Sequence, residues 1–356
     1  MIAFDSLHQQ TAHAILRERE QLVKNAIDRQ YASQPDEWQR YQEAGYQKSL
    51  RDSHFHFTYL AEALAHANLP VFLDYVGWLK IFFASKAFPP ATLSETLRHM
   101  LPALHDRLPA EQAALAGSYL EQALAHVPAL PDSIPSFLSP ENPYFDLAND
   151  YLNCMLKGDR RSGSQLILAA VQDGAPVREI YLHVFQNTQR ELGRLWHLGR
   201  ISVAQEHFTT AATQMVISQL YPYIFTGERN GRSLVATCVG EELHELGIRT
   251  VADFFEMDGW DTYFLGANTP AESVIRSLSE RQADLAAISV TLPAHISKAT
   301  ALIQSIRSAL PQVKLLVGGY PFNVSPDLWQ AVGADGSAPD AEKAVQVGNL
   351  LVGEAG

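Results

Sequence analysis

The sequence predicts a chain that combines helical domains with a C-terminal α/β domain. Residues 1–130 and 145–226 show only helical periodicity, whereas residues 232–356 alternate short apolar runs with helical patterns. Several prolines, too many for a helix to continue, separate the two helical regions at residues 131–144. We therefore expect an all-helical N-terminal domain, a linker, a four-helix bundle and a doubly wound, flavodoxin-like sheet of five parallel strands.

The composition is typical of a soluble globular protein of the reducing cytoplasm. A formal net charge of −12, with no basic tract, argues against nucleic acid as a partner. The two cysteines, Cys154 and Cys238, lie far apart and lack metal-type spacing, which excludes a disulfide framework. Met1–Asp5 does not open a secretory leader, and no apolar stretch reaches the roughly 18 residues of a membrane span. We expect a cytoplasmic protein with no membrane contact.

Start and stop residues divide the N-terminal domain into helices. Asp52 or Ser53 could cap the second of them, Pro70 could start the third, and Pro89-Pro90 ends it. The expected helices cover residues 11–31, 52 or 53 to 66, 70–88, 92–107 and 109–126.

The bundle and the sheet are divided in the same way. Lys157-Gly158 and Asp173-Gly174 are helix stops, while Pro176 and Ser202 are helix starts. The expected bundle helices are 151–156, 162–171, 177–198 and 202–225. The expected strands are 233–238, 262–265, 285–290, 313–317 and a short one near Gly336, with helices at about 246–258, 270–281, 294–309, 325–331 and 340–351.

The loop after the first strand carries the pattern Glu242-x-His244-x-x-Gly247. Open α/β sheets bind ligands at the carboxyl ends of their strands, and this loop lies at such an end. An acidic residue near a histidine is the usual partner that orients a metal-ligating imidazole. A lone histidine on a loop would more often be an ordinary surface residue, so further residues are needed to support a site.

Small and hydroxyl residues at the next strand ends supply that support. Ser289-Val290-Thr291 ends the third strand, and Gly318-Gly319 follows the fourth. Together with the histidine loop, this ordered set resembles cobalamin-binding domains of the base-off, His-on type. The resemblance implies that His244 is the lower cobalt ligand, that Glu242 and Gly247 shape its loop, and that Ser289, Thr291 and the two glycines line the slot for the nucleotide tail.

The bundle contains a second pattern, in which Trp196 is followed after nine residues by Glu206-His207. These residues could simply be a core tryptophan and a solvated helix face. The spacing nevertheless resembles the lid of the light-sensing adenosylcobalamin repressors, in which the bundle covers the upper face of the corrin. The resemblance implies that Trp196, Glu206 and His207 hold the adenosyl group. It also implies that His197 becomes the upper cobalt ligand after light cleaves the cobalt–carbon bond.

The N-terminal domain departs from those repressors, because residues 1–130 show no winged helix-turn-helix of the MerR kind and no basic recognition helix. A helical, aromatic-rich domain fused to such a module resembles the photocobilins, which pair adenosylcobalamin with a bilin such as biliverdin. No cysteine occurs in residues 1–130, so binding would be non-covalent or would use Cys154. The alternative is a purely structural or dimerisation domain. The candidate bilin contacts are aromatic, histidine and basic residues: His54, His56, Tyr59, Tyr75, Trp78, Lys80 and Arg98.

These resemblances imply a photoreceptor and not an enzyme. Photolysis would move the lid and change the state of a homo-oligomer or the binding of a downstream signalling protein. One alternative is a corrinoid methyl carrier that serves a methyltransferase, although a methyl group needs no adenosyl pocket. Another is a sensor of the vitamin itself, which would share every binding residue with a photoreceptor.

Overall fold

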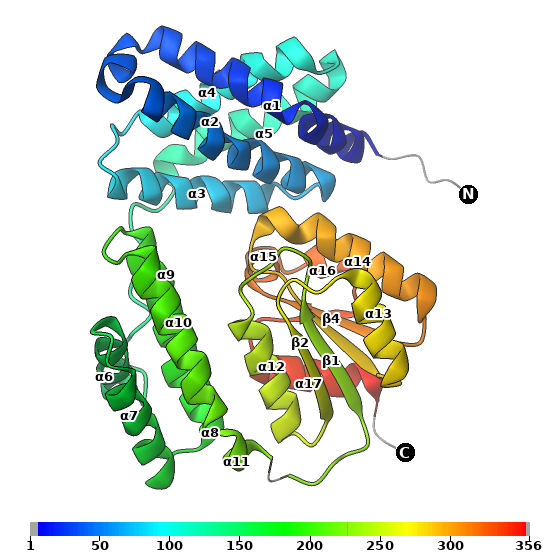
Figure 1. The fold of residues 1–356 in the computed structure, drawn as a ribbon. Coiled ribbons are helices and arrows are strands. Elements are labelled where there is room, and N and C mark those ends of the chain that lie inside the picture. Colours follow the sequence, from blue (N-terminus) through cyan, green and yellow to red (C-terminus); the bar gives the residue numbers. More distant parts are fainter. Residues whose placement is uncertain (1–5, 226, 354–356) are drawn as a thin grey trace. The chain divides into compact units, whose positions relative to one another are not determined.

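A computed structural model describes residues 6–225 and 227–353 of the chain (Figure 1). The expectation about a leader concerns Met1–Asp5, which lie outside the described residues. The chain divides into two compact units. The first consists of Met1–Asp132, Val290–Ala301 and Tyr320–Gly333, and the second of Ser133–Ser289, Leu302–Gly319 and Ala334–Gly356.

The first unit is built from long helices around an apolar core. Its N-terminal helices are α1 (Leu7–Ser33), α2 (Pro35–Ala65), α3 (Leu69–Ser85), α4 (Thr92–Arg107), α5 (Ala110–His126) and the short η1 (Val127–Ala129). Side chains from all five long helices, including Ile15, Phe57, Phe72, Leu97 and Leu120, are fully or almost fully buried in that core. The expectation of an all-helical N-terminal region is confirmed.

One expected boundary in this unit is wrong. The second helix begins at Pro35 rather than at Asp52 or Ser53. Proline suits the first helical position, because its missing N–H would have no partner there. Ser53 is buried inside the helix instead of capping it. The backbone of Gln42 leaves the helical conformation (φ 50°, ψ −158°), so α2 is kinked.

The second unit begins with the helical bundle. Its helices are α6 (Phe145–Leu156), α7 (Arg160–Gln172), the continuous run α8 (Val177–Glu179), η2 (Ile180–Phe185) and α9 (Gln186–His197), then α10 (Val203–Ser218) and α11 (Tyr221–Ile224). The run to α9 passes through a π-helical stretch at η2. The last expected helix, 202–225, is split in two. Pro222 explains the break, since its ring would clash with the carbonyl of Ser218 in a continuous helix.

The sheet of the second unit has five parallel strands in the order β2-β1-β3-β4-β5. The strands are β1 (Ser233–Cys238), β2 (Asp261–Gly266), β3 (Leu285–Ser289), β4 (Lys314–Gly318) and β5 (Gly336–Ala338). The helices that follow them are α12 (Leu246–Met257), α13 (Ala271–Glu280), η3 with α14 (Pro293–His295, Ile296–Ala309), α15 with α16 (Tyr320–Val324, Leu328–Ala331) and α17 (Ala341–Val352). The doubly wound, flavodoxin-like fold is confirmed, and α15 is an unexpected addition.

This strand order places the topological switch point between β1 and β3, the position at which such sheets bind ligands. The strand ends are in register there: Cys238 pairs with Ser289, Ser289 with Gly318, and Gly318 with Ala338. The residues expected to bind therefore emerge along one edge of the sheet.

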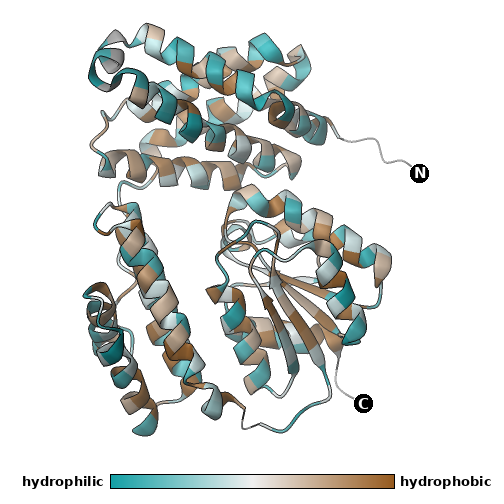
Figure 2. Ribbon diagram, viewed as in Figure 1, coloured by the Kyte–Doolittle hydropathy of each residue, from teal (hydrophilic) through white to brown (hydrophobic). Residues whose placement is uncertain are grey.

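The bundle and the sheet share one apolar core. Tyr181 of η2 packs edge-on against Phe254 of α12, and both are buried with Trp260. Hydrophobic residues dominate the strands (Figure 2). Among the described residues, no helix is long and apolar enough to cross a membrane.

Candidate functional site

The loop between β1 and α12 holds His244 against a buried carboxylate. Glu242 is fully buried, and its Oε1 lies 2.5 Å from the ring Nδ1 of His244 and accepts a hydrogen bond from the His244 backbone N–H (3.1 Å). The backbone of Asn268 bonds the carbonyl of Glu242 (3.1 Å), and its side chain accepts from the N–H of Glu241 (2.8 Å). The loop after β2, which contains Asn268, therefore helps to hold the loop that carries His244 in place.

This arrangement sets the chemistry of the imidazole. The hydrogen bond to Glu242 raises the pKa of His244, against the opposing effect of burial, and the charges of Glu242 and Glu206 act in the same direction. Because the carboxylate accepts at Nδ1, the lone pair of the neutral ring is on Nε2. Nε2 has no hydrogen bond to a described residue, and the side chain is 56% exposed. His244 can thus offer Nε2 to a metal.

A metal held here would need most of its ligands from elsewhere. Within residues 6–225 and 227–353, no group of three or more histidine, cysteine, aspartate or glutamate side chains could hold a metal ion. One oriented imidazole is what a cobalt ion already held in a corrin ring requires. The residues present therefore fit a corrinoid better than a metal ion bound by protein ligands alone.

The residues at the neighbouring strand ends have small side chains. A Cβ added to Gly318 would lie 3.2 Å from the carbonyl oxygen of Ala338, so a side chain would crowd β5. Gly319 has a φ of 107°, a conformation that favours glycine. Ser289 is buried and Thr291 half-buried. Gly247, by contrast, is exposed with open space around it, so packing does not explain a glycine there.

One face of α10 is directed toward the histidine loop. Gln214 Nε2 donates to Glu245 Oε1 (2.9 Å), and Arg249 Nη2 donates to the Ser218 hydroxyl (2.9 Å). Ala211, three residues before Gln214, and His207, four residues before Ala211, lie on the same helical face. The His207 side chain is 75% exposed, and Ala211 is exposed. The lower half of this face is bonded to the sheet side, and the upper half is uncovered.

The expected lid residues gather at the uncovered end. Gln189 of α9 bonds the hydroxyls of Thr210 and Thr213 of α10 (3.1 and 3.0 Å), which sets the register of the two antiparallel helices. Seven residues further along α9, Trp196 is level with the first turn of α10, where Glu206 lies. The Glu206 carboxylate lies 2.5 Å from His207 Nδ1 and accepts from Thr210 (3.1 Å).

His197, the next residue after Trp196, differs from the other lid residues. It is the last residue of α9 and is only 3% exposed, whereas Trp196 is half-buried. It could reach a ligand above His244 only after a change at this end of the bundle.

The candidate bilin residues fall into two groups. Tyr59 stacks on Tyr75 (3.9 Å between ring centroids), and Tyr75 stacks in turn toward Trp78 (6.4 Å). The Nδ1 of buried His56 lies 2.7 Å from the hydroxyl of Tyr75, and burial lowers the pKa of His56 to about 4. The remaining three do not join this group: Lys80 pairs with Asp132 (2.8 Å), Arg98 pairs with Glu95 (2.5 Å), and His54 is half-buried.

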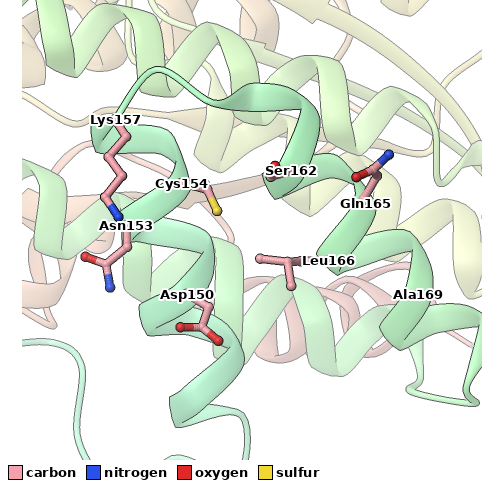
Figure 3. A pocket seen from close by; sticks show the side chains of 8 residues that line it. All are labelled: Asp150, Asn153, Cys154, Lys157, Ser162, Gln165, Leu166 and Ala169. Atoms are coloured by element: carbon pink, nitrogen blue, oxygen red, sulfur yellow. The ribbon is translucent and has the colours of Figure 1, made fainter.

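Cys154, the alternative attachment point, lines a pocket of about 580 Å³ between α6 and α7 (Figure 3). The pocket also contains Asp150, Lys157 and Gln165. Burial raises the pKa of the Cys154 thiol, which disfavours the reactive thiolate. The pocket contains none of the residues expected to bind cobalamin.

Two carboxylates, one in α12 and one just before it, make contacts with the bundle that were not expected from the sequence. Asp253 accepts from the hydroxyls of Tyr181 (2.7 Å) and Tyr221 (3.2 Å), and burial raises the pKa of Asp253 to about 6. Glu245 accepts from Gln214 and from the N–H of Ala267 (3.0 Å). In the sequence Asp253 looks like a polar residue on a helix surface, so no local signal marks it. For Glu245, the only indication of a role in the sequence is its position next to His244.

Comparison with known proteins agrees with this geometry. Two family models of the B12 binding domain match the chain, one over residues 232–346 and the other over residues 147–221. Neither reaches residues 1–130. The chain therefore contains a cobalamin-binding region made of the sheet domain and the bundle, and the expectation of a cobalamin cofactor is confirmed at this level.

The chain is similar to relatives of at least two kinds. A corrinoid protein of Desulfitobacterium hafniense is 24% identical over 58% of this chain and 98% of its own length. The HTH-type transcriptional repressor CarA of Myxococcus xanthus is 29% identical over 34% of this chain and 41% of its own length. The solved monomethylamine corrinoid protein of Methanosarcina barkeri is 18% identical over 57% of this chain and 97% of its own, with a TM-score of 0.52, which supports the fold alone.

The carboxylate–imidazole contact can be tested without any cofactor. Glu242→Gln keeps the size of the side chain but removes its charge, so the pKa of His244 should fall from its raised value toward the ordinary one. An NMR titration of the His244 ring protons in both proteins measures this change, with Glu241→Gln as the exposed control. An unchanged pKa in Glu242→Gln would show that Glu242 does not set the state of the ring.

Proposed function

We propose that this B12-binding protein is a light sensor that uses adenosylcobalamin, with His244 as the lower cobalt ligand and the bundle as a movable lid. The observation that carries the proposal is the uncovered end of the bundle, where Glu206 contacts His207 on α10 and Trp196 is at the same level on α9. None of these three is among the described residues of the apolar core shared by the bundle and sheet.

The hydrogen bonds between the bundle and the sheet domain join them at one end of the bundle and not at the other. Gln214–Glu245, Ser218–Arg249 and the two tyrosines on Asp253 join the lower part of the bundle to α12 and its loop. Beyond them, no hydrogen bond or ion pair between described residues joins His207 or Ala211 to the sheet. A flat group could enter at this end without breaking the hydrogen bonds at the other.

Exposed apolar side chains next to His244 and on α10 also favour a bound group. Leu243, next to His244, is 71% exposed, and Phe208 and Met215 on α10 are 37% exposed. Exposed apolar surface rimmed by polar residues often marks a binding site. A corrin ring, apolar on its faces and polar at its edge, would cover such residues.

When bound, adenosylcobalamin would supply a cobalt–carbon bond that visible light can cleave. His244, oriented by Glu242, would hold the cobalt from below, and Trp196 and Glu206 would hold the adenosyl group from above. If that group left, Trp196 and Glu206 would lose their contacts with it, and this end of the bundle would be less firmly held. Movement at this end would then uncover His197, which is buried in the described structure.

The expected output is a change in a homo-oligomer or in the binding of a downstream signalling protein, and we propose no enzymatic step. We further propose that the N-terminal helices bind biliverdin non-covalently. The stacked rings of Tyr59, Tyr75, Trp78 and Phe82 support this, because Trp78 is 36% exposed within the stack and offers ring surface to a tetrapyrrole.

A corrinoid methyl carrier is the second candidate. It is favoured by the matched lengths, because the corrinoid protein of Desulfitobacterium hafniense is covered almost completely, whereas the repressor CarA is covered over 41% of its length. The Trp196 and Glu206-His207 set favours the light sensor, since a methyl group would leave most of the uncovered lid face unfilled. A sensor of cobalamin itself would need the same residues but no light.

Illumination tests the proposal directly. Protein loaded with adenosylcobalamin in the dark should change both its absorption spectrum and its elution volume in size-exclusion chromatography after green light. Protein loaded with hydroxocobalamin, which has no cobalt–carbon bond to cleave, should change neither. If the adenosyl form keeps its spectrum and elution volume under light, the light-sensor function is wrong.

His197 can be tested separately from the dark site. His197→Ala should leave the dark spectrum unchanged, because the residue is buried in the described structure. Its illuminated spectrum should lack the signature of a nitrogen upper ligand, and the photoproduct should lose the corrinoid at least about tenfold faster. His183→Ala, at another histidine of the bundle, is the control. Identical illuminated spectra for wild type and His197→Ala would remove His197 from the mechanism.

A further inference from the structure

A buried carboxylate in the first unit caps a helix that follows the sheet. Glu62 of α2 is 5% exposed, and its Oε2 accepts from both the backbone N–H (2.9 Å) and the hydroxyl (2.7 Å) of Ser297. Ser297 is the second residue of α14, where the backbone N–H has no acceptor within the helix. A carboxylate at this position also interacts favourably with the positive end of the helix dipole.

The environment of Glu62 makes this contact sensitive to substitution. Burial raises the pKa of Glu62 to about 7, against the lowering effect of the Ser297 hydrogen bonds and the charges of His295 and Lys298. His66, one turn later on α2, places Nδ1 4.0 Å from the same carboxylate oxygen. Because the Glu62 carboxylate has little contact with solvent, it depends on the Ser297 donors. Removing either residue's polar group therefore leaves buried polar atoms of the other unpaired.

Three further hydrogen bonds come from the same end of α2 and the start of α3. His66 Nε2 lies 3.0 Å from the Thr300 hydroxyl, and Asn68 Nδ2 donates to the Ser325 hydroxyl (2.7 Å). The hydroxyl of Tyr320 donates to Asp74 (2.8 Å). The bonded segments, Val290–Ala301 and Tyr320–Gly333, are the two that the first unit takes from the C-terminal half of the chain.

Each of these two segments follows directly on a strand of the sheet. Val290–Ala301 continues directly from Ser289 at the end of β3, and Tyr320–Gly333 continues directly from Gly319 after β4. Ser289 and Gly318 pair side by side in the sheet. The helices α2 and α3 therefore bond both segments that leave the strand ends where the nucleotide tail of a cobalamin is expected.

We propose that Glu62 is a positioning residue for corrinoids that carry a nucleotide tail, acting by fixing the start of α14 and so the path of the chain beyond Ser289. This inference rests on the proposed cobalamin site. The N-terminal helices would then contribute to the choice of ligand, favouring corrinoids with a tail over those without one. By reciprocity, a bound tail would stabilise the contact between α2 and α14.

Ligand comparison in the full-length protein tests the inference. Isothermal titration in the dark would compare adenosylcobalamin with adenosylcobinamide, which has the same upper ligand but no nucleotide tail. Glu62→Ala should weaken adenosylcobalamin binding about tenfold and leave the affinity for adenosylcobinamide unchanged. Ser297→Ala, which removes only the hydroxyl donor, should give a smaller loss of the same selective kind. Glu121→Ala, at an exposed glutamate of α5, is the control and should change neither affinity.

Amide hydrogen exchange supplies a second readout that does not depend on affinity. Adenosylcobalamin should slow exchange in the last two turns of α2 in wild type but not in Glu62→Ala, and adenosylcobinamide should slow it in neither. Equal losses of affinity for both ligands, or no loss for either in both Glu62→Ala and Ser297→Ala, would overturn the role of Glu62. Failure of the wild-type protein to bind either ligand would instead overturn the cobalamin site on which the inference rests.

Discussion

The contact between the Glu242 carboxylate and the His244 imidazole is the interaction on which the rest of the site depends. A fully buried carboxylate is costly unless it is paired, and here it is bonded by both the ring and the backbone of the same histidine. That pairing turns Nε2 outward at the carboxyl edge of the sheet. It also places a negative charge behind the ring, which makes the ring a stronger electron donor toward a metal.

The surrounding fold serves this orientation in two ways. The sheet brings Ser289, Gly318 and the histidine loop to one edge, at the switch point of the strand order. The bundle is anchored to α12 by Asp253 and Glu245 and is uncovered near Trp196 and His207. A lid anchored at one end can respond to a ligand at the other without disturbing the shared core. This division between a fixed end and an uncovered end is the physical basis for proposing a sensor.

Sequence patterns were sufficient to predict the features that depend on residues close together in the sequence. Alternation of apolar runs and helical patterns placed all five strands, and the spacing around His244 predicted its carboxylate partner. The start of α2 was missed because Ser53 has the chemistry of a cap although it packs inside the helix. Asp253 and Glu62 were missed for another reason. Each owes its importance to partners 72 and 235 residues away, which no local pattern encodes.

Every other part of the proposed mechanism requires that a protein histidine replaces the nucleotide base on cobalt. Electron paramagnetic resonance of the protein loaded with the Co(II) corrinoid tests it most directly, because the axial nitrogen splits the cobalt lines. Protein labelled with ¹⁵N only in histidine should convert the triplet splitting given by ¹⁴N into a doublet, and His244→Ala should abolish that conversion. A triplet that persists in the labelled wild-type protein would place the nucleotide base on cobalt and contradict the account.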